Sequence, residues 1–193
     1  VSAPGDPFLE FYFSTVPEGP LSPRLSALQA GDAVQVAPKP NGFLVLDEVP
    51  PSIHLWLVST GTGLGPFLSI LNTPEPWQRF QRVVLVHAAR TADELTYRRA
   101  IARIAEAEPK RFTYVPFLSR ESADYALAGR IPQAIADGRL EARAGLGFDA
   151  ALAHVMLCGN PAMVADASAA LTTRGFRKHK RKEPGQISME TYW

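Results

Sequence analysis

The sequence predicts an α/β fold, a doubly wound parallel sheet with helices on both faces, which follows an N-terminal segment of all-β character. From residue 54 onward, continuous apolar runs alternate with segments of helical periodicity, as strands buried on both faces require. Before residue 50, short β-prone runs are separated by turns rich in proline and glycine. We place the boundary at Pro50 and Pro51, which gives domains 1–50 and 51–193.

The N-terminal segment is expected to consist of strands with one short helix. Its β-prone runs predict strands at residues 8–16, 33–38 and 43–49. Leucines recur at helical spacing after Pro20, with Ser22 as a plausible N-cap and Pro23 at the first helical position.

Four apolar runs supply the strands of the expected sheet. These strands are predicted at residues 54–59, 83–89, 112–118 and 154–159. Helices are predicted at about 65–72, 93–107, 131–137 and 161–174, and residues 187–193 form a strand or an extended tail. This alternation is typical of a doubly wound sheet with right-handed crossovers.

The strongest local motif is the glycine-rich turn at residues 59–66 (STGTGLGP), between the first strand and the first helix of the sheet. Its glycines, together with Thr60, let backbone amides approach a pyrophosphate, and the helix N-terminus adds partial positive charge. The alternative is that Gly61, Gly63 and Gly65 only form a tight turn. Pro66 stands where the usual dinucleotide fingerprint has its third glycine, so a conventional NAD dehydrogenase is disfavoured.

Arginines lie where the expected strands end, and ligands of doubly wound sheets bind beyond these carboxyl ends. Arg90 and Arg120 follow two of the four strands, and Arg130 follows in a G-R-I-P turn. Guanidinium groups bind phosphate oxygens bidentately and stack on adenine, so the set favours the adenosine 2′-phosphate of NADP. The alternative is a solvated arginine or an ion pair to Asp93 or Glu121.

Three further features allow a structural or a functional interpretation. Cys158 ends an apolar strand, either as a small buried hydrophobe or with its thiol beside a reacting ring. His87 and His154 lack neighbours at ligand spacing, which favours structural roles and no metal site. Residues 174–182 hold six Lys/Arg, either a solvated run or a docking site for an acidic partner.

Composition limits the class of protein. The formal net charge of +1 gives no global reason to expect nucleic acid or an anionic membrane as partner. The single cysteine cannot form an intrachain disulfide, and no apolar stretch approaches a membrane span, so we expect a cytoplasmic protein. Because Val1 is neither a starting Met nor part of a leader, the sequence is expected to begin inside a longer gene product.

Together these motifs resemble the bacterial ferredoxin(flavodoxin)–NADP reductases, in particular the subgroup that ends in Tyr-Trp. The stretches that carry the resemblance are LEFY (9–12), GPLSPRLSALQAGD (19–32), GFLVLDEVP (42–50), TGTGLGPFLSIL (60–71), VLVHAAR (84–90), SRE (119–121), GRIP (129–132), VMLCGNPAMV (155–164) and PGQISMETYW (184–193). The resemblance implies an FAD-dependent enzyme that passes electrons between NADPH and ferredoxin or flavodoxin by hydride transfer between nicotinamide and flavin.

The resemblance also implies a division of the chain and a monomer. Residues 1–50 would be the C-terminal part of an antiparallel, FAD-binding β-barrel, whose first half and R-x-Y-S motif would precede Val1. Residues 51–193 would be the NADP-binding α/β domain.

The same resemblance implies roles for individual residues. Those matching FAD contacts are Tyr12, Pro20, Leu21, Ser22, Thr62, Tyr192 and Trp193. Those assigned to NADP are Thr60, Gly61, Gly63, Arg90, Ser119, Arg120, Arg130 and Gly159. Those matching catalytic positions near the flavin–nicotinamide contact are Cys158 and Glu190.

Two other functions stay open at this point. One is an NADP-binding module without catalysis, which an incomplete barrel favours. The other is a reductase coupled to an oxygenase, but such proteins often carry a four-cysteine iron–sulfur domain and this chain has one cysteine.

Overall fold

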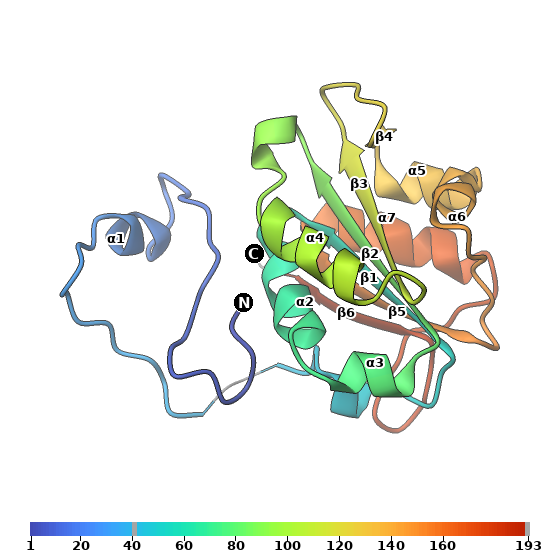
Figure 1. The fold of residues 1–193 in the computed structure, drawn as a ribbon, viewed down its shortest axis with the longest axis horizontal. Coiled ribbons are helices and arrows are strands. Elements are labelled where there is room, and N and C mark those ends of the chain that lie inside the picture. The colour runs from blue at the N-terminus through green and yellow to red at the C-terminus, as the bar shows by residue number, and fades with distance from the viewer. Residues whose placement is uncertain (40–41, 192–193) are drawn as a thin grey trace.

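In the computed structural model, which describes residues 1–39 and 42–191, six strands form one all-parallel sheet (Figure 1). They are β1 (His54–Thr60), β2 (Arg82–Ala89), β3 (Phe112–Leu118), β4 (Leu127–Ala128), β5 (Ala153–Gly159) and β6 (Ile187–Thr191). The order across the sheet is β4-β3-β2-β1-β5-β6, and every neighbouring pair is parallel. The predicted doubly wound sheet is confirmed.

Helices cover both faces of the sheet. The helices are α1 (Ser22–Ser26), α2 (Leu64–Leu71), α3 (Glu75–Arg79), α4 (Arg98–Ala107), α5 (Ile131–Ala136), α6 (Arg139–Ala144) and α7 (Pro161–Thr172). Short 3₁₀ turns occupy Leu46–Glu48, Gly61–Gly63 and Ala92–Glu94. Figure 1 shows α2, α3 and α4 on one face and α5, α6 and α7 on the other. No helix within residues 1–39 and 42–191 is long and apolar enough to cross a membrane.

The continuous apolar runs are explained by burial on both faces of each central strand. In β1, Leu55 and Leu57 face the core beneath α2 and α4, while Trp56 and Val58 face the core beneath α5 and α7. All four side chains are completely buried. A strand that is covered on both faces cannot alternate polar with apolar residues, which is why the sequence pattern predicted it correctly.

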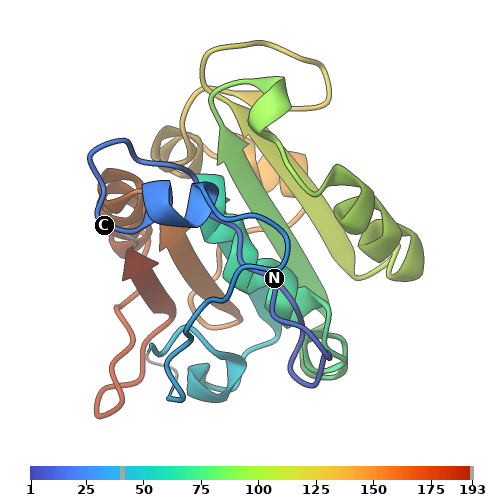
Figure 2. The same cartoon turned by 90° about the vertical axis from the view of Figure 1, so that its left-hand side faces the viewer.

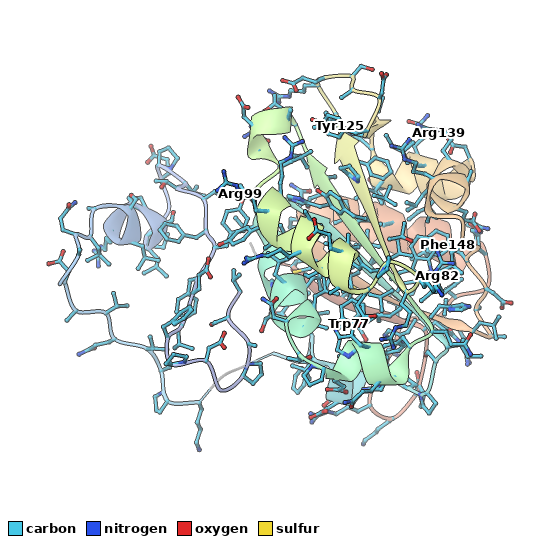
Figure 3. The ribbon with its side chains drawn as sticks, in the orientation of Figure 1. Trp77, Arg82, Arg99, Tyr125, Arg139 and Phe148 are labelled. Carbon is cyan, nitrogen blue, oxygen red and sulfur yellow. The ribbon has the colours of Figure 1, made fainter. Side chains whose placement is uncertain are left out.

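Arg174, the first residue of the basic run 174–182, packs at the edge of the core beneath α5 and α7. Phe148, labelled in Figure 3, stacks on Trp56 with ring centroids 4.1 Å apart, and the Arg174 guanidinium lies 5.5 Å from the centroid of the Phe148 ring. Arg174 also forms an ion pair with Glu141, whose Oε1 accepts a hydrogen bond from Arg174 Nη2 at 2.8 Å. Arg174 therefore belongs to the packing of this domain rather than to a solvated basic surface.

The predicted elements of the sheet domain differ from the structure mainly at short segments. Helices α3 and α6 and the two-residue strand β4 were not predicted, because such short elements carry little periodicity. The helix predicted from residue 93 begins at Arg98 instead, since the chain first makes a 3₁₀ turn and then takes a positive φ at Tyr97.

The strand predictions for the N-terminal segment are wrong as local structure. Within residues 1–39 and 42–53 the structure contains no strand, and the segment forms an arm beside α2 (Figures 1 and 2). A β-prone run becomes a strand only where another strand pairs with its backbone, and none of the described residues does so here. Large apolar side chains are consequently exposed, among them Phe8 at 60%, Leu9 at 66% and Phe43 at 63%.

The predicted helix of the arm is present as α1, but its cap differs from the prediction. Leu21 rather than Ser22 occupies the N-cap position. The Ser22 hydroxyl instead accepts a hydrogen bond from the Val16 N–H at 2.9 Å, which closes the turn before the helix.

Two buried histidines agree with the structural roles predicted for them. His87 on β2 and His154 on β5 have 0% and 1% of their surface exposed. Burial lowers the pKa of His87 to about 4, and burial with the nearby His179 and Arg79 lowers that of His154 to about 3. His154 Nε2 lies 2.9 Å from Ser188 Oγ on the neighbouring strand. Both rings are therefore neutral at pH 7.

We expect the free energy of unfolding to fall as the pH is lowered from 6.5 to 5. In the unfolded chain each histidine has a pKa near 6.5 and takes up a proton in this range, whereas in the folded protein the two rings stay neutral. Each ring should therefore cost about 1 kcal/mol between pH 6 and 5. Urea unfolding at several pH values measures how the free energy of unfolding changes with pH, and this slope gives the number of protons taken up on unfolding. His154→Gln should lower that number by about one. An unchanged slope would contradict the assignment.

Candidate functional site

The carboxyl ends of β1 and β5 form the switch point of the sheet. From β1 the chain builds outward through β2, β3 and β4, and it then returns to the other side of β1 with β5 and β6. In open α/β sheets, ligands bind in the crevice outside the strands at this point. The glycine-rich turn after β1 and residues 158–160 after β5 meet there.

These two turns are in backbone contact. A Cβ at Gly63 would lie 2.5 Å from the Cys158 carbonyl oxygen, and a Cβ at Gly159 would collide with the Thr60 hydroxyl. Gly159 also has a φ of +129°, which favours glycine. The Asn160 N–H donates to Thr60 Oγ1 at 2.9 Å and ties the turns together. Packing against β5 therefore explains the glycine at position 63.

The Cβ side of Gly61 faces open space. Gly61 has a φ of +51° and no atom within 4 Å of the position a Cβ would take. Helix α2 begins directly after this turn, and no described side chain caps its first N–H groups or places an acid in its first turn. The Leu64 N–H donates to the Gly61 carbonyl within the turn, and Pro66 has no N–H, so the partial positive charge of the helix end is the feature that suits an anion here.

Asn160 was not predicted as a site residue. Its Oδ1 accepts hydrogen bonds from the N–H groups of Ala162 at 2.9 Å and Met163 at 3.3 Å, so it caps α7. An asparagine before Pro161 at the first helical position is a recognisable start signal that could have identified it.

The three arginines predicted for NADP lie at the tips of three neighbouring strands. The Arg120 N–H donates to the Arg90 carbonyl at 2.9 Å, which joins the extensions of β2 and β3. Arg130 follows β4, whose next residue, Gly129, donates to the Leu118 carbonyl on β3 at 2.9 Å. Ser119 lies between these contacts, and all three arginines are exposed. The fold thus brings together arginines up to 40 positions apart in the sequence.

Arg90 is held by an ion pair whose partner the sequence did not identify. Its Nε and its backbone N–H each donate to Glu94 at 2.9 Å, and Nη2 lies 2.7 Å from Glu94 Oε1. These hydrogen bonds raise the pKa of Arg90 and lower that of Glu94. Glu121, one of the two expected partners, instead accepts from the Ala92 N–H at 2.8 Å.

An exposed aromatic ring lies at the same end of the sheet. Tyr125, in the loop between β3 and β4, is 42% exposed (Figure 3). Arg98 lies over its ring at 5.2 Å, and Arg143 donates to its carbonyl oxygen at 2.7 Å. No periodic pattern marks this tyrosine, because it lies in an irregular loop.

Cys158 and Glu190 are paired at the carboxyl ends of β5 and β6. Cys158 is completely buried, and Glu190 is partly exposed. A Cβ at Gly42 would lie 3.3 Å from Glu190 Oε2, so the carboxylate faces the N-terminal arm. The structure therefore places both predicted catalytic residues beside the switch point.

The residues predicted for FAD are spread along the arm and the glycine turn. Tyr12 is half-buried, with its Cβ 3.9 Å from the Cβ position of Gly65 on α2, and Thr62 is buried within the turn. Pro20, Leu21 and Ser22 lie at the start of α1, at the outer part of the arm (Figure 1). Tyr192 and Trp193 lie outside the described residues.

The fold and this edge define a nucleotide-binding oxidoreductase domain, and comparison with known proteins agrees. The family model for the oxidoreductase NAD-binding domain matches residues 57–169. The chain is 47% identical to the flavodoxin/ferredoxin–NADP reductase of Escherichia coli K12 over 100% of its length and 78% of that protein. It is 36% identical to the ferredoxin–NADP reductase of Pseudomonas aeruginosa, over 94% and 73%. The chain belongs to the ferredoxin/flavodoxin–NADP reductase family.

A solved structure supports the same membership. A ferredoxin NADP⁺ reductase from Neisseria gonorrhoeae with bound FAD and NADP matches with a TM-score of 0.86 and 33% identity. The match covers 92% of this chain and 72% of that one, which is more of the chain than residues 54–193 alone. The likeness therefore extends into the N-terminal arm.

We expect Gly63→Ala to destabilise the fold by about 1–3 kcal/mol, because its methyl group must displace the backbone of β5. Gly63 has a φ of −59°, so conformational strain does not contribute. Gly147→Ala is the matched control, since Gly147 has no positive φ and its nearest atom would lie 3.5 Å away. Thermal and urea unfolding compare the two variants. Equal stability in both would show that the turns are not tightly packed.

Proposed function

We propose that this chain is an FAD-dependent oxidoreductase that transfers electrons between NADPH and ferredoxin or flavodoxin. The observation that carries the proposal is one edge of the sheet. At this edge the glycine turn and the start of α2, which no side chain caps, lie with the three arginines that follow β2, β3 and β4. Reductases of the same family, one of them solved with FAD and NADP, match nearly the whole chain.

The described residues fit NADP. The open side of Gly61 and the start of α2 suit the pyrophosphate, since there is open space beside the glycine and the helix end carries partial positive charge with no side-chain cap and no acid in its first turn. Arg90, Arg120 and Arg130 supply the guanidinium groups that a 2′-phosphate prefers. Glu94 fixes one edge of the Arg90 guanidinium and leaves other N–H groups for the ligand. We assign Thr60, Ser119 and Gly159 to the same nucleotide, as the sequence predicted.

The arm fits a planar aromatic cofactor. Tyr12 presents a half-buried ring beside α2, and large apolar side chains are exposed along the same segment. We assign Tyr12, Thr62 and the Pro20–Ser22 turn to FAD, and the boundary at residue 50 stays a prediction. Bound FAD would exchange a hydride with the nicotinamide and pass on single electrons.

The chain's own residues would align the two rings and exclude water. Cys158 ends β5 among apolar side chains, so its thiol would give the nicotinamide a small, weakly polar neighbour. Glu190 on the next strand would place a carboxylate beside the same position. The contact between Gly63 and Gly159 holds both strand ends fixed, which preorganises the site.

We further propose that an acidic electron carrier docks near the basic run. Arg177, Lys178 and Lys182 are exposed, whereas Lys180 pairs with Glu183 and Arg181 pairs with Glu48. A positive surface would speed association with an acidic protein, and the effect would weaken as salt rises. The monomeric state and the cytoplasmic location stay predictions.

A flavin absorbance spectrum tests the enzyme against the alternative of a non-catalytic NADP-binding module. The enzyme should hold FAD, and NADPH should bleach its absorbance. The exposed, strand-free arm is the one observation that favours the module. A protein that binds NADPH but no flavin would support the module.

We expect Arg120→Ala and Arg130→Ala each to weaken NADPH binding by about tenfold or more, because each removes a charge-assisted hydrogen bond to phosphate. NADH lacks the 2′-phosphate, so its affinity should hardly change. Lys110→Ala is the control, since Lys110 is an exposed cation just before β3, at the opposite end of that strand. Titration calorimetry measures all affinities, and wild-type protein that binds NADPH no better than NADH would overturn the NADP assignment.

We expect Cys158→Ala to slow hydride transfer by about 10- to 100-fold while NADPH affinity changes little, because small displacements at the reacting centre are costly. Cys158→Ser is close in size and shape to the native side chain, so it separates loss of packing from loss of the sulfur atom. Stopped-flow mixing of the holoenzyme with NADPH measures the rate. An unchanged hydride rate in the alanine variant would remove Cys158 from the catalytic assignment.

A further inference from the structure

Tyr97 is the one non-glycine residue with a positive φ among residues 1–39 and 42–191. Its φ of 56° and ψ of 19° place it in the left-handed region, directly before α4. For a bulky side chain this conformation is a clear outlier that the surrounding structure must hold in place. Neither the glycine turn nor the arginine tips require it.

The Tyr97 side chain reaches across to the N-terminal arm. Its hydroxyl donates to Glu10 Oε1 at 2.7 Å, which links residues 87 positions apart. Its ring meets the ring of Tyr12 edge-on, with centroids 5.4 Å apart and planes at 71°. Partial burial and the Glu10 carboxylate raise the pKa of Tyr97, so its hydroxyl remains a donor at every physiological pH.

The same stretch of the arm is fixed to α2. Ser69 Oγ donates to the Ser2 carbonyl at 2.7 Å, and the Glu10 N–H donates to the Ser2 hydroxyl at 3.1 Å. Tyr12 packs beside Gly65 in the first turn of α2. Tyr12 is therefore held from two sides, by α2 and by Tyr97, next to the glycine turn of the nucleotide site.

We propose that Tyr97 is a positioning residue for the flavin. It fixes Tyr12 through the edge contact and the arm through Glu10, and Tyr12 in turn sets the flavin plane against the α/β domain. The left-handed backbone at Tyr97 directs its side chain away from α4 and toward Glu10 and Tyr12. This contact explains why the unfavourable conformation is kept. This inference rests on the proposed function, because it requires FAD beside Tyr12.

Two substitutions separate the ring from the hydroxyl. Tyr97→Asn removes the ring but tolerates the left-handed backbone, so the fold should survive. Tyr97→Phe keeps the ring and removes only the hydrogen bond. In the holoenzyme we expect Tyr97→Asn to weaken FAD binding by about two- to tenfold, the range of an aromatic pair, and Tyr97→Phe to retain most of the affinity.

Spectroscopy of the bound flavin gives a readout beyond activity. A tyrosine stacked on the flavin quenches its fluorescence, so loosening Tyr12 should raise the fluorescence and change the visible circular dichroism, while the KM for NADPH changes little. If Tyr97 acts through Tyr12, Tyr97→Asn should have no further effect in a Tyr12→Ala background. Glu10→Ala, at an exposed residue, removes the same hydrogen bond as Tyr97→Phe, so both should shift the flavin signals in the same direction as Tyr97→Asn but by a smaller amount. These two variants cover the case in which Tyr97→Asn does not fold.

Glu18→Ala is the control, because Glu18 is an exposed acid of the same arm. Unchanged flavin spectra and FAD affinity in both Tyr97→Asn and Glu10→Ala, or fully additive effects with Tyr12→Ala, would overturn the inference. Wild-type protein that binds FAD but is not reduced by NADPH would sink the proposed function and leave these flavin readouts intact. Wild-type protein that binds no FAD would overturn both.

Discussion

The close contact between the turns after β1 and β5 is the constraint on which the site depends. With Gly63 against the carbonyl of Cys158 and Gly159 against Thr60, the two strand ends have a fixed separation. The hydrogen bond from the Asn160 N–H to Thr60 Oγ1 links the same turns, and the Asn160 side chain starts α7. The start of α2, the start of α7 and the end of β5 are thereby placed by one backbone contact, and an active site assembled from separate elements requires such rigidity.

The arginine tips depend on the sheet in a different way. They are exposed and lie on extensions of β2, β3 and β4, so parallel register rather than core packing sets their spacing. An exposed guanidinium is free to adapt to a phosphate, and Glu94 limits this freedom only for Arg90. The site therefore combines a rigid glycine turn with exposed arginines that can adjust their side chains. This combination suits a ligand that has a rigid reacting ring at one end and a charged phosphate at the other.

The sequence predicted the sheet well because its signals are local. Continuous apolar runs, such as that around Trp56, identify strands buried on both faces, and parallel strands place their ends on one edge. Two residues were missed for different reasons: Glu94 pairs with Arg90 only four positions away but lies in a polar stretch without a periodic pattern, and Tyr97 contacts the arm across 87 positions. Gly63 was identified, but its packing against β5 could not be deduced without the fold.

The arm shows the converse limit of local signals. Residues 8–16 have strong β propensity, yet propensity describes a fit to a pleated, paired surface and does not supply the partner. In the structure the first part of the arm is held instead by side-chain contacts, among them those of Ser69 to Ser2 and of Tyr97 to Glu10 and Tyr12. These contacts connect the stretch around Tyr12 to α2 and to Tyr97, and they contribute to where Tyr12 lies relative to the glycine turn. The other end of the arm is held separately, because Arg79 donates to the carbonyls of Leu46 and Val49. A strained tyrosine at the start of α4 is therefore well placed to couple the flavin-binding segment to the nucleotide-binding sheet.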